Sequence, residues 1–324
     1  MAIPKIFSGV HESDSGVPPN TISLGGRGSK YQKDPEENLM MFWDSFDEKI
    51  CLTLKTTPER KKAAEAEFKK VNLSDVDFFY GCLPGDEIVK DAFREGKVHA
   101  YPSCWRCGQD KCGCENNILV PAQVACFMSY VKIFEHAANS DSYTFLIMED
   151  DIEFESYCNE VGEQVFQRDK LEAMHFYSEF PCLLSLGQNY FGKGHIGTRH
   201  YNNNIRWADG DLSECNVMFA FNKPYAKLAL RFLKKFTMTS DIYIHNFLGT
   251  RCVHWSLFPR LSHDKSWSLG TVKSTIHPKQ VLVDNKNLPM KMRLAEKQRM
   301  VKHTKRVESE AQYNKYIQDY LKDP

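Results

Sequence analysis

The chain has 324 residues, of which 42% are hydrophobic and 26% charged, values typical of an ordinary globular protein with a full core. Lys and Arg together number 42, as do Asp and Glu, so the formal net charge is zero. A neutral chain lacks the overall field that draws basic proteins to nucleic acid or anionic membranes, and we expect neither partner. The N-terminus shows no apolar leader with a cleavage site, and no window approaches about 18 uninterrupted apolar residues. We therefore expect a cytoplasmic protein without a membrane span.

Residues 1–47 form the first predicted region, an arm followed by a short helix. Residues 1–34 are rich in Gly, Ser, Pro and Asn, which predicts an extended or partly disordered arm. A short helix is expected from Pro35. Its apolar face would consist of Leu39, Met40, Trp43 and Phe46.

The main domain is expected over residues 48–284, and it begins with a strand, a helix and a second strand. Residues 49–54 and 76–80 have strand composition, and residues 59–70 have the Ala, Glu and Lys content of a helix, with Pro58 suited to its start. This order within about thirty residues predicts a βαβ unit and a parallel sheet.

Four of the eleven cysteines cluster in the long connection at residues 82–120. Cys104, Cys107, Cys112 and Cys114 lie in a Cys-rich insertion at about 100–116, with a spacing that suits one structural Zn²⁺. Two disulfides or free thiols are the alternatives. The remaining seven cysteines are scattered, and we expect them to be mostly reduced.

After this connection the pattern again alternates between helix and strand. A helix is predicted at 122–137 behind Pro121, strands at 143–149, 181–186 and 216–221, and a helix at 223–235. These elements predict an α/β fold with a mixed central sheet and helices on both faces. Residues 285–324 are rich in Lys and Glu with helical spacing, which predicts a helical C-terminal tail that forms a peripheral helix pair or binds a partner.

The most informative segment is an apolar strand that ends in three carboxylates. Residues 145–148 can be buried, but Glu149, Asp150 and Asp151 repel one another unless a cation or hydrogen-bond donors offset their charge. Ligands bind at the carboxyl ends of strands in α/β sheets, so this motif is placed to hold a divalent metal and nucleotide phosphates. Glu149 and Asp151 would share a face if the segment stays extended. The alternative is a solvated strand end that caps a following helix.

Three segments, in this order, resemble glycosyltransferase family 25, the lipooligosaccharide and procollagen galactosyltransferases. The first is the strand and turn of residues 50–60, which ends in Arg60. The second is the helix of residues 123–134, which leads to the acidic motif. The third is residues 219–228 with Ser240 and Asp241 beyond it. The resemblance covers roughly residues 48–270.

This resemblance implies a nucleotide-diphospho-sugar transferase of the GT-A type. The implied reaction moves a hexose, galactose or glucose, from a UDP-sugar to a hydroxyl acceptor on a glycan or protein, with inversion and with Mn²⁺ or Mg²⁺. The expected partners are therefore a nucleotide sugar and its acceptor, and a homodimer is left open.

The resemblance also assigns site residues. Asp151 would bind the metal directly, and Glu149 would act through water or on the ribose, while Asp150 would orient the turn or join the donor contacts. His263 is the expected third metal ligand, with His254 and His245 as alternatives. The donor wall would consist of Thr53, Leu54, Arg60, Ser129 and Tyr130, although Arg60 equally suits a charged helix surface.

The expected catalytic base is Asp241, which also suits an ordinary helix cap together with Ser240. The other candidates lie on the preceding loop: Asp209, Asp211 and Glu214. Sequence does not show whether any of these carboxylates reaches the acceptor hydroxyl.

Three positions depart from the family pattern. Ala125 and Tyr225 replace Gly, and Tyr130 replaces His, and we expect these changes to affect the donor pocket and sugar identity but not the carboxylates. One alternative is therefore a catalytically inactive, zinc-braced binding module of the same fold. A nucleotidyltransferase would use similar carboxylates, but no Gly-rich phosphate signature lies near the first strand.

Overall fold

The computed structural model describes residues 42–98, 119–187, 189–190, 199–200, 206–209, 213–266, 272 and 310–322. The predicted N-terminal arm, the four clustered cysteines and Asp211 lie outside these residues, so the zinc site stays a prediction. The seven other cysteines are described, and all are free thiols. None of the described helices is long and apolar enough to cross a membrane.

Within the described residues the central sheet has eight strands in the order β2-β1-β3-β10-β5-β11-β8-β7. Their bounds are β1 (Glu48–Thr53), β2 (Val76–Tyr80), β3 (Thr144–Glu149), β5 (Cys182–Ser185), β7 (Arg199–His200), β8 (Arg206–Asp209), β10 (Met218–Asn222) and β11 (Val253–Phe258). Strand β1 is parallel to β2 and β3, and β5 is parallel to β11. Strand β10 lies between β3 and β5 and is antiparallel to both. The carboxyl ends of β1, β2, β3, β5 and β11 therefore lie at the same edge of the sheet.

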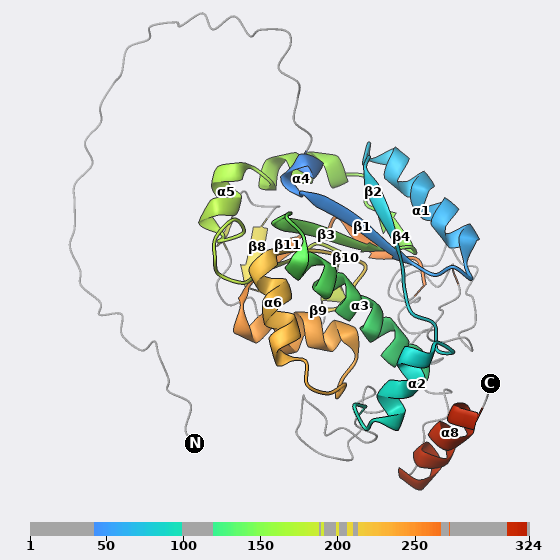
Figure 1. The fold of residues 1–324 in the computed structure, drawn as a ribbon. Helices are drawn as coiled ribbons and strands as arrows, with labels where there is room; N and C mark the ends of the chain where they lie inside the picture. Colours follow the sequence, from blue (N-terminus) through green and yellow to red (C-terminus); the bar gives the residue numbers. More distant parts are fainter. Residues whose placement is uncertain are drawn as a thin grey trace, which may run out of the picture. The chain divides into compact units, whose positions relative to one another are not determined.

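Helices cover both faces of this sheet (Figure 1). Their bounds are α1 (Pro58–Lys70), α2 (Glu87–Arg94), α3 (Pro121–Asn139), α4 (Cys158–Val165), α5 (Arg168–Ala173), α6 (Lys223–Phe232) and α8 (Glu310–Lys322). Three short helical segments complete them: η1 (Phe42–Ser45), the π-helical η2 (Ile242–Phe247) and η3 (Gly249–Arg251). Two small strand pairs flank the sheet, β4 (Ile152–Phe154) with β12 (Ser262–Asp264) and β6 (Asn189–Tyr190) with β9 (Ser213–Glu214).

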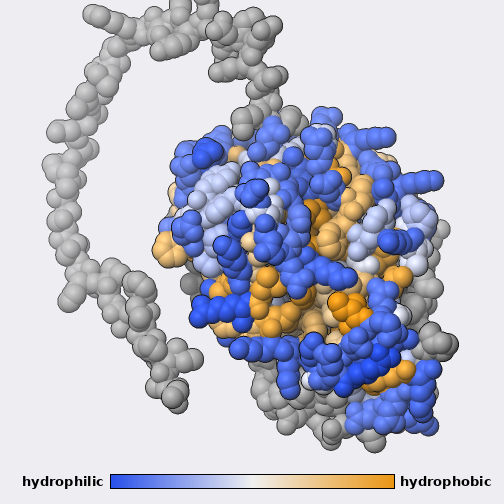
Figure 2. Space-filling model, viewed as in Figure 1, coloured by the Kyte–Doolittle hydropathy of each residue, from blue (hydrophilic) through white to orange (hydrophobic). Residues whose placement is uncertain are grey.

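The apolar residues form two cores, one on each face of the sheet. Leu146 and Met148 of β3 pack with α1, α4 and α5, whereas Phe145 and Ile147 pack with α2, α3 and α6. This alternation follows from the two-residue period of a strand. A strand buried on both faces reads as a continuous apolar run, which is why residues 145–148 contain no polar side chain. Figure 2 shows apolar residues in patches over α3 and α6, among hydrophilic residues.

The observed elements confirm the predicted α/β fold with a mixed central sheet. The βαβ unit is present with β1 parallel to β2, and the helix behind Pro121 extends to Asn139. The acidic strand ends at Glu149, as predicted. Strands β8, β11 and β12 and segment η2 have no counterpart among the predicted elements. Of the helical tail, the structure describes α8.

Two buried polar side chains, Asn222 and Tyr225, hold α6 against its neighbouring elements. Asn222 caps α6: its Oδ1 accepts the backbone N–H groups of Tyr225 and Cys182, and its Nδ2 donates to the carbonyls of Ser178 and Phe180. The hydroxyl of Tyr225, buried in the core, donates to the carbonyl of Ile244 at 2.8 Å. The tyrosine that replaces the family glycine therefore ties α6 to η2.

Candidate active site

The three carboxylates lie where β3 ends, at the edge shared by the carboxyl ends of the parallel strands. The backbone holds this position from both sides, because Glu149 N donates to Val217 O at 3.0 Å and Asp150 N donates to Leu52 O at 3.1 Å. The chain then turns at Asp150 and Asp151 before β4 begins. The expectation that Glu149 and Asp151 share a face of an extended segment is therefore wrong, because the strand stops at Glu149.

Arg60 of α1 joins the second and third carboxylates. Its guanidinium lies 2.6 Å from Asp150 Oδ1 and 3.2 Å from Asp151 Oδ2, and all three side chains are largely buried. Thr53, at the end of β1, donates its hydroxyl to Asp150 Oδ2 at 2.7 Å. Arg60 and Thr53 were both predicted at the donor side of the site, and the structure brings them together with the acidic motif.

Glu149 has a separate partner on the opposite face of the sheet. The hydroxyl of Tyr130, on the buried side of α3, donates to Glu149 Oε1 at 2.5 Å. The expectation that the departures from the family pattern leave the carboxylates untouched is therefore wrong. Tyr130 is a direct partner of the first carboxylate, because α3 crosses β3 at this point.

Burial raises the pKa of all three carboxyl groups. Burial and the nearby charge of Asp151 raise the pKa of Glu149 to about 8, against the lowering effect of the Tyr130 hydrogen bond. Burial also raises the pKa of Asp150 to about 6, although Arg60 and Thr53 favour its ionised form. The pKa of Asp151 is raised by burial and by the charge of Asp264, with Arg60 again opposing. The site therefore holds negative charge that its own residues neutralise only in part.

The donor set fits a cation that arrives together with a substrate. Asp151 Oδ1 is buried and accepts no hydrogen bond from any of the described residues, so one carboxylate oxygen at the site is available. Among the described residues, however, no group of three His, Cys, Asp or Glu side chains could hold a metal ion alone. Mg²⁺ typically binds through one or two carboxylates and takes its remaining ligands from phosphate and water. Asp151 and Glu149 can supply such a partial set.

The structure places His263 beside Glu155, because its Nδ1 lies 3.0 Å from Glu155 Oε1. The next residue on the same strand, Asp264, is buried, and its charge contributes to the raised pKa of Asp151. Cys215 Sγ lies 3.6 Å from Asp264 Oδ1 and connects this strand to the loop before β10. Asp264 had no signal in the sequence, since a single Asp after a His is common on a protein surface.

The two alternative histidines lie in a separate buried cluster. Ser185 Oγ of β5 is 2.9 Å from His245 Nδ1 of η2 and 2.8 Å from His254 Nε2 of β11. Burial and the neighbouring His254 hold the pKa of His245 well below its ordinary value, so the ring is neutral. These rings join η2 to the sheet.

The expected base, Asp241, lies at the start of η2. Its carboxylate accepts a hydrogen bond from Thr239 Oγ1, and the adjacent Ser240 hydroxyl accepts one from Asn216 Nδ2 at 3.1 Å. Ser240 Oγ also lies 3.7 Å from the thiol of Cys126, and the pKa of that thiol is raised by burial first and then by the charges of Glu149 and Asp241. Asp241 is therefore in the electrostatic neighbourhood of the acidic motif. Asp209 and Glu214 lie in β8 and β9, without described side chains.

The donor wall also contains residues that hold the loop after β2. Ser129 Oγ accepts the N–H of Cys82 at 2.8 Å and donates to Ala125 O, and a Cβ on Gly81 would lie 2.7 Å from the same hydroxyl. The carbonyl of Leu54 accepts the N–H of Thr57 in the turn before α1. Both predicted residues thus shape the backbone around the site.

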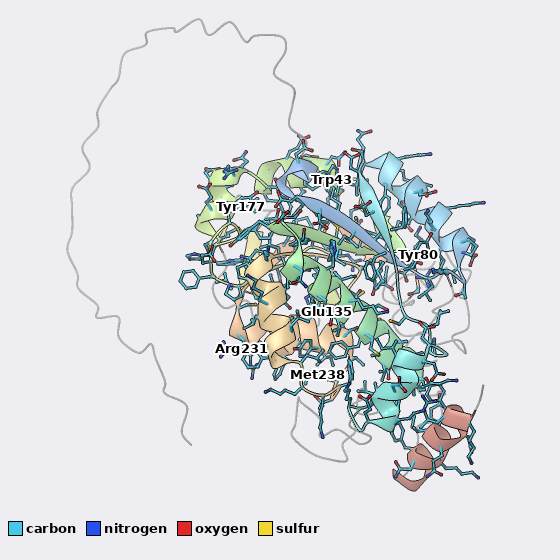
Figure 3. All side chains as sticks on the ribbon, viewed as in Figure 1. Trp43, Tyr80, Glu135, Tyr177, Arg231 and Met238 are labelled. Carbon is cyan, nitrogen blue, oxygen red and sulfur yellow. The ribbon has the colours of Figure 1, made fainter. Side chains whose placement is uncertain are left out.

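One exposed aromatic residue at this edge was not predicted from the sequence. Tyr80 ends β2 beside Thr53, its ring is 45% exposed, and Lys55 Nζ lies 5.7 Å from the ring centre (Figure 3). An aromatic residue at the end of a strand is also typical of a buried core, so its sequence position gave no signal.

Comparison with known proteins agrees with this geometry. A search of curated proteins found no match. Residues 46–186 match the family model described as glycosyltransferase family 25 (LPS biosynthesis protein). The match runs from the start of β1 to the end of β5, so it contains Thr53, Arg60, Tyr130 and the acidic motif, whereas Asp241 and His263 lie beyond it. Residues 46–186 are therefore similar to the glycosyltransferase family 25 domain, and this match supports glycosyltransferase activity.

Proposed function

We propose that the protein transfers a hexose, galactose or glucose, from a UDP-sugar to a hydroxyl group of a glycan or protein, with inversion and with a divalent cation. The observation that carries this proposal is the set of contacts around Glu149, Asp150 and Asp151. At the ligand-binding edge of the sheet, Asp150 and Asp151 share the guanidinium of Arg60, and Glu149 accepts a hydrogen bond from Tyr130. One buried oxygen of Asp151 has no hydrogen-bond partner among the described residues.

The charge balance of this set indicates how the donor binds. A diphosphate would be repelled by Asp150 and Asp151, because the single guanidinium of Arg60 cannot offset both of these carboxylates. A Mn²⁺ or Mg²⁺ ion held by Asp151 and Glu149 would bridge these like charges and would neutralise the charge that develops on the leaving UDP. Arg60 Nε is buried and has no hydrogen-bond partner among the described residues, so Arg60 retains a donor for the phosphate side. The ribose and base would lie toward Thr53 and the exposed ring of Tyr80.

Inversion requires a single displacement at the anomeric carbon. The acceptor oxygen forms a bond to that carbon while the bond to the UDP oxygen breaks, and the hydroxyl proton passes to a base. We assign this base to Asp241, at the start of η2, because the adjacent Ser240 lies 3.7 Å from Cys126 of α3, the helix whose Tyr130 contacts Glu149. An isolated carboxylate base of this kind typically contributes a factor of about 10²–10⁴.

The test begins with a panel of UDP-sugars screened by thermal shift in the presence of Mn²⁺. The sugar that gives the largest stabilisation is then used to measure UDP release, with EDTA as a control and with Mn²⁺ added back. Slow donor hydrolysis that disappears with EDTA and returns with Mn²⁺ supports the proposal. Donor binding without any turnover in the presence of candidate acceptors would favour the inactive binding module.

The assignment of the base has its own comparison. Asp241→Asn should reduce transfer by about a hundredfold or more and leave the Kd of UDP with Mn²⁺ nearly unchanged. Asp151→Asn should reduce transfer and also weaken the binding of UDP in the presence of Mn²⁺. If Asp241→Asn weakens UDP binding as strongly as Asp151→Asn does, Asp241 is not the base, and Asp209, Asp211 and Glu214 become the residues to test.

A further inference from the structure

The C-terminal helix α8 contacts the catalytic domain through two tyrosine hydroxyl groups. Tyr313, which is buried, donates to the carbonyl of Leu119, and Tyr320 donates to the carbonyl of Pro84. The Tyr320 ring also packs edge-on against Phe93 of α2, with 5.7 Å between ring centres. Tyr313 and Tyr320 are two helical turns apart, so their side chains lie on the same side of α8. Figure 1 shows α8 beside α2, in agreement with the ring contact between Tyr320 and Phe93.

These two hydrogen bonds hold the two ends of the connection between β2 and α3. Pro84 lies four residues after β2 ends at Tyr80, and Leu119 lies two residues before α3 begins at Pro121. The partners are 194 and 236 residues apart in the sequence. Because the acceptors are backbone carbonyls, the contacts depend on the path of the loop and not on its side chains.

The loop that α8 reaches leads directly to the acidic motif. This donor-side loop, residues 81–86, is pinned at its start, where Gly81 N donates to Thr53 O at 2.8 Å. Thr53 in turn donates its hydroxyl to Asp150. At the other end of the loop, Leu83 N donates to Asp86 Oδ2, and Asp86 is the N-cap residue of α2. Between these two points, the backbone carbonyl of Pro84 accepts the hydrogen bond from the Tyr320 hydroxyl.

We propose that Tyr313 and Tyr320 are positioning residues, and that α8 holds the donor-side loop against the sheet edge and thereby increases affinity for the nucleotide part of the donor. This inference rests on the proposed function for its donor, but the anchoring of the loop is a property of the fold alone. The hydroxyl groups touch no reacting atom in this arrangement. They act through Pro84, Gly81 and Thr53.

The anchoring is tested by hydrogen–deuterium exchange on the full-length protein. Tyr320→Phe keeps the ring against Phe93 and removes the hydrogen bond to Pro84. Tyr316→Phe is the matched control, because Tyr316 lies between the two residues on the same helix and its ring is 44% exposed. Loss of one hydrogen bond should speed exchange in the peptide spanning residues 79–90 by about 2- to 10-fold. Tyr313→Phe should have a comparable effect on residues 119–124. Exchange equal to that of Tyr316→Phe would overturn the anchoring.

The donor role is tested by the Kd of UDP in the presence of Mn²⁺, measured by calorimetry on the same variants. We expect Tyr320→Phe to raise this Kd about 2- to 10-fold, and Tyr316→Phe to leave it unchanged. With a turnover assay, the KM for the donor should rise while kcat is retained. Faster exchange with an unchanged Kd would overturn the donor role. A wild-type protein that binds no UDP would refute the proposed function and this donor role, whereas the exchange result would still decide whether α8 anchors the loop.

Discussion

At the level of single residues, the carboxylates of the acidic motif are bound by side chains from opposite faces of the sheet. Arg60 approaches Asp150 and Asp151 from α1, and Tyr130 approaches Glu149 from α3. Two adjacent carboxylates therefore share a cation, while the third is held by a neutral donor. Burial and the charge of Asp151 raise the pKa of Glu149 to about 8, and the hydrogen bond from Tyr130 opposes this rise only in part.

Asp151→Asn should abolish cation-dependent donor turnover without unfolding the protein. Loss of a metal ligand removes several kcal/mol of transition-state stabilisation, which is a rate loss of about a hundredfold or more. The folded protein should be as stable or more stable, because the ionised carboxylate is disfavoured where it lies and Arg60 keeps Asp150. The measurements are UDP release and the midpoint of thermal unfolding without metal. Near-normal turnover would remove Asp151 from the metal site.

Tyr130→Phe should destabilise the fold by about 1–3 kcal/mol, because it leaves the carboxyl group of Glu149 without its donor. In the Glu149→Gln background the same change should cost less, since a neutral amide needs the donor less than a carboxylate does. Chemical denaturation of the four proteins at pH 8.5, where Glu149 is ionised, gives the coupling energy. Additive losses would mean that the hydrogen bond between Tyr130 and Glu149 contributes nothing to stability.

His245 should make the protein less stable in mild acid. Its folded-state pKa lies well below the ordinary value, whereas in the unfolded chain the imidazole binds a proton with a pKa of about 6.5. Below that pH the unfolded state takes up more protons, so the free energy of unfolding falls as the pH decreases. His245→Asn keeps an acceptor or donor near Ser185 but does not titrate. Between pH 7.5 and 5.5 the wild type should lose more stability than this variant, and parallel curves would contradict the assignment.

At the level of elements, capping and strand order place the site. Asn222 both ends β10 and begins α6, and its side chain holds the backbone on each side of the start of β5. Because β10 pairs with β3, this cap also fixes the strand that carries the acidic motif. The side chain of Asn222 thus links the start of α6 to β5 directly, and to β3 through the pairing of β10 with β3.

Asn222→Ala should therefore destabilise the protein by more than about 2 kcal/mol. The change leaves buried N–H and carbonyl groups without partners, and each such group typically costs about 1–3 kcal/mol. Asn139→Ala is the control, because Asn139 lies at the exposed end of α3 and its side chain bonds to Glu135 O. Urea denaturation measures both, and the control should lie within about 0.5 kcal/mol of wild type. Equal effects would show that the Asn222 network is not a structural centre.

The elements that could be predicted from the sequence are those with one consistent pattern. Strands β1, β2 and β3 and helices α1, α3 and α6 have apolar or alternating runs with ordinary end signals, so the βαβ unit and the site of the acidic motif could be predicted. Strand β11 carries buried His254 and Ser256, and η2 carries buried His245. Polar residues inside an element break the periodicity on which prediction depends. Their burial is explained only by partners far along the chain.

The same limit applies to the candidate site. The position of the three carboxylates follows from local pattern, because they directly succeed an apolar strand. The contact between Tyr130 and Glu149 depends on how α3 packs against the sheet, and the effect of the Asp264 charge on Asp151 depends on the pairing of β12 with β4. Both are tertiary arrangements that no local window contains. His263 was chosen because it follows a proline much as a histidine does in the collagen-modifying relatives, and this resemblance carries no information about the adjacent Asp264.

For the molecule as a whole, the partial ligand set predicts that cation and nucleotide stabilise the fold together. Without a group of three ligating side chains in the described part, Mn²⁺ alone should raise the unfolding temperature little. UDP alone should also do little, because the carboxylates repel it. With both present at about 100 times their Kd, the stabilisation should be about 2.7 kcal/mol. Thermal shift with each ligand separately and together decides this, and a full shift with Mn²⁺ alone would indicate a preformed metal site.

The position of β10 in the sheet also sets the order in which the chain can fold during synthesis. Strand β3 can pair with β1 as soon as it leaves the ribosome, but its other neighbour, β10, follows about 70 residues later. At roughly 5–20 residues per second this interval lasts several seconds. During that time Phe145, Leu146, Ile147 and Met148 lie on an open sheet edge, where unpaired strands are prone to join other chains. The strand that carries the acidic motif is thus exposed to misassembly during this interval, and slow synthesis between residues 150 and 218 should lower the yield of folded protein.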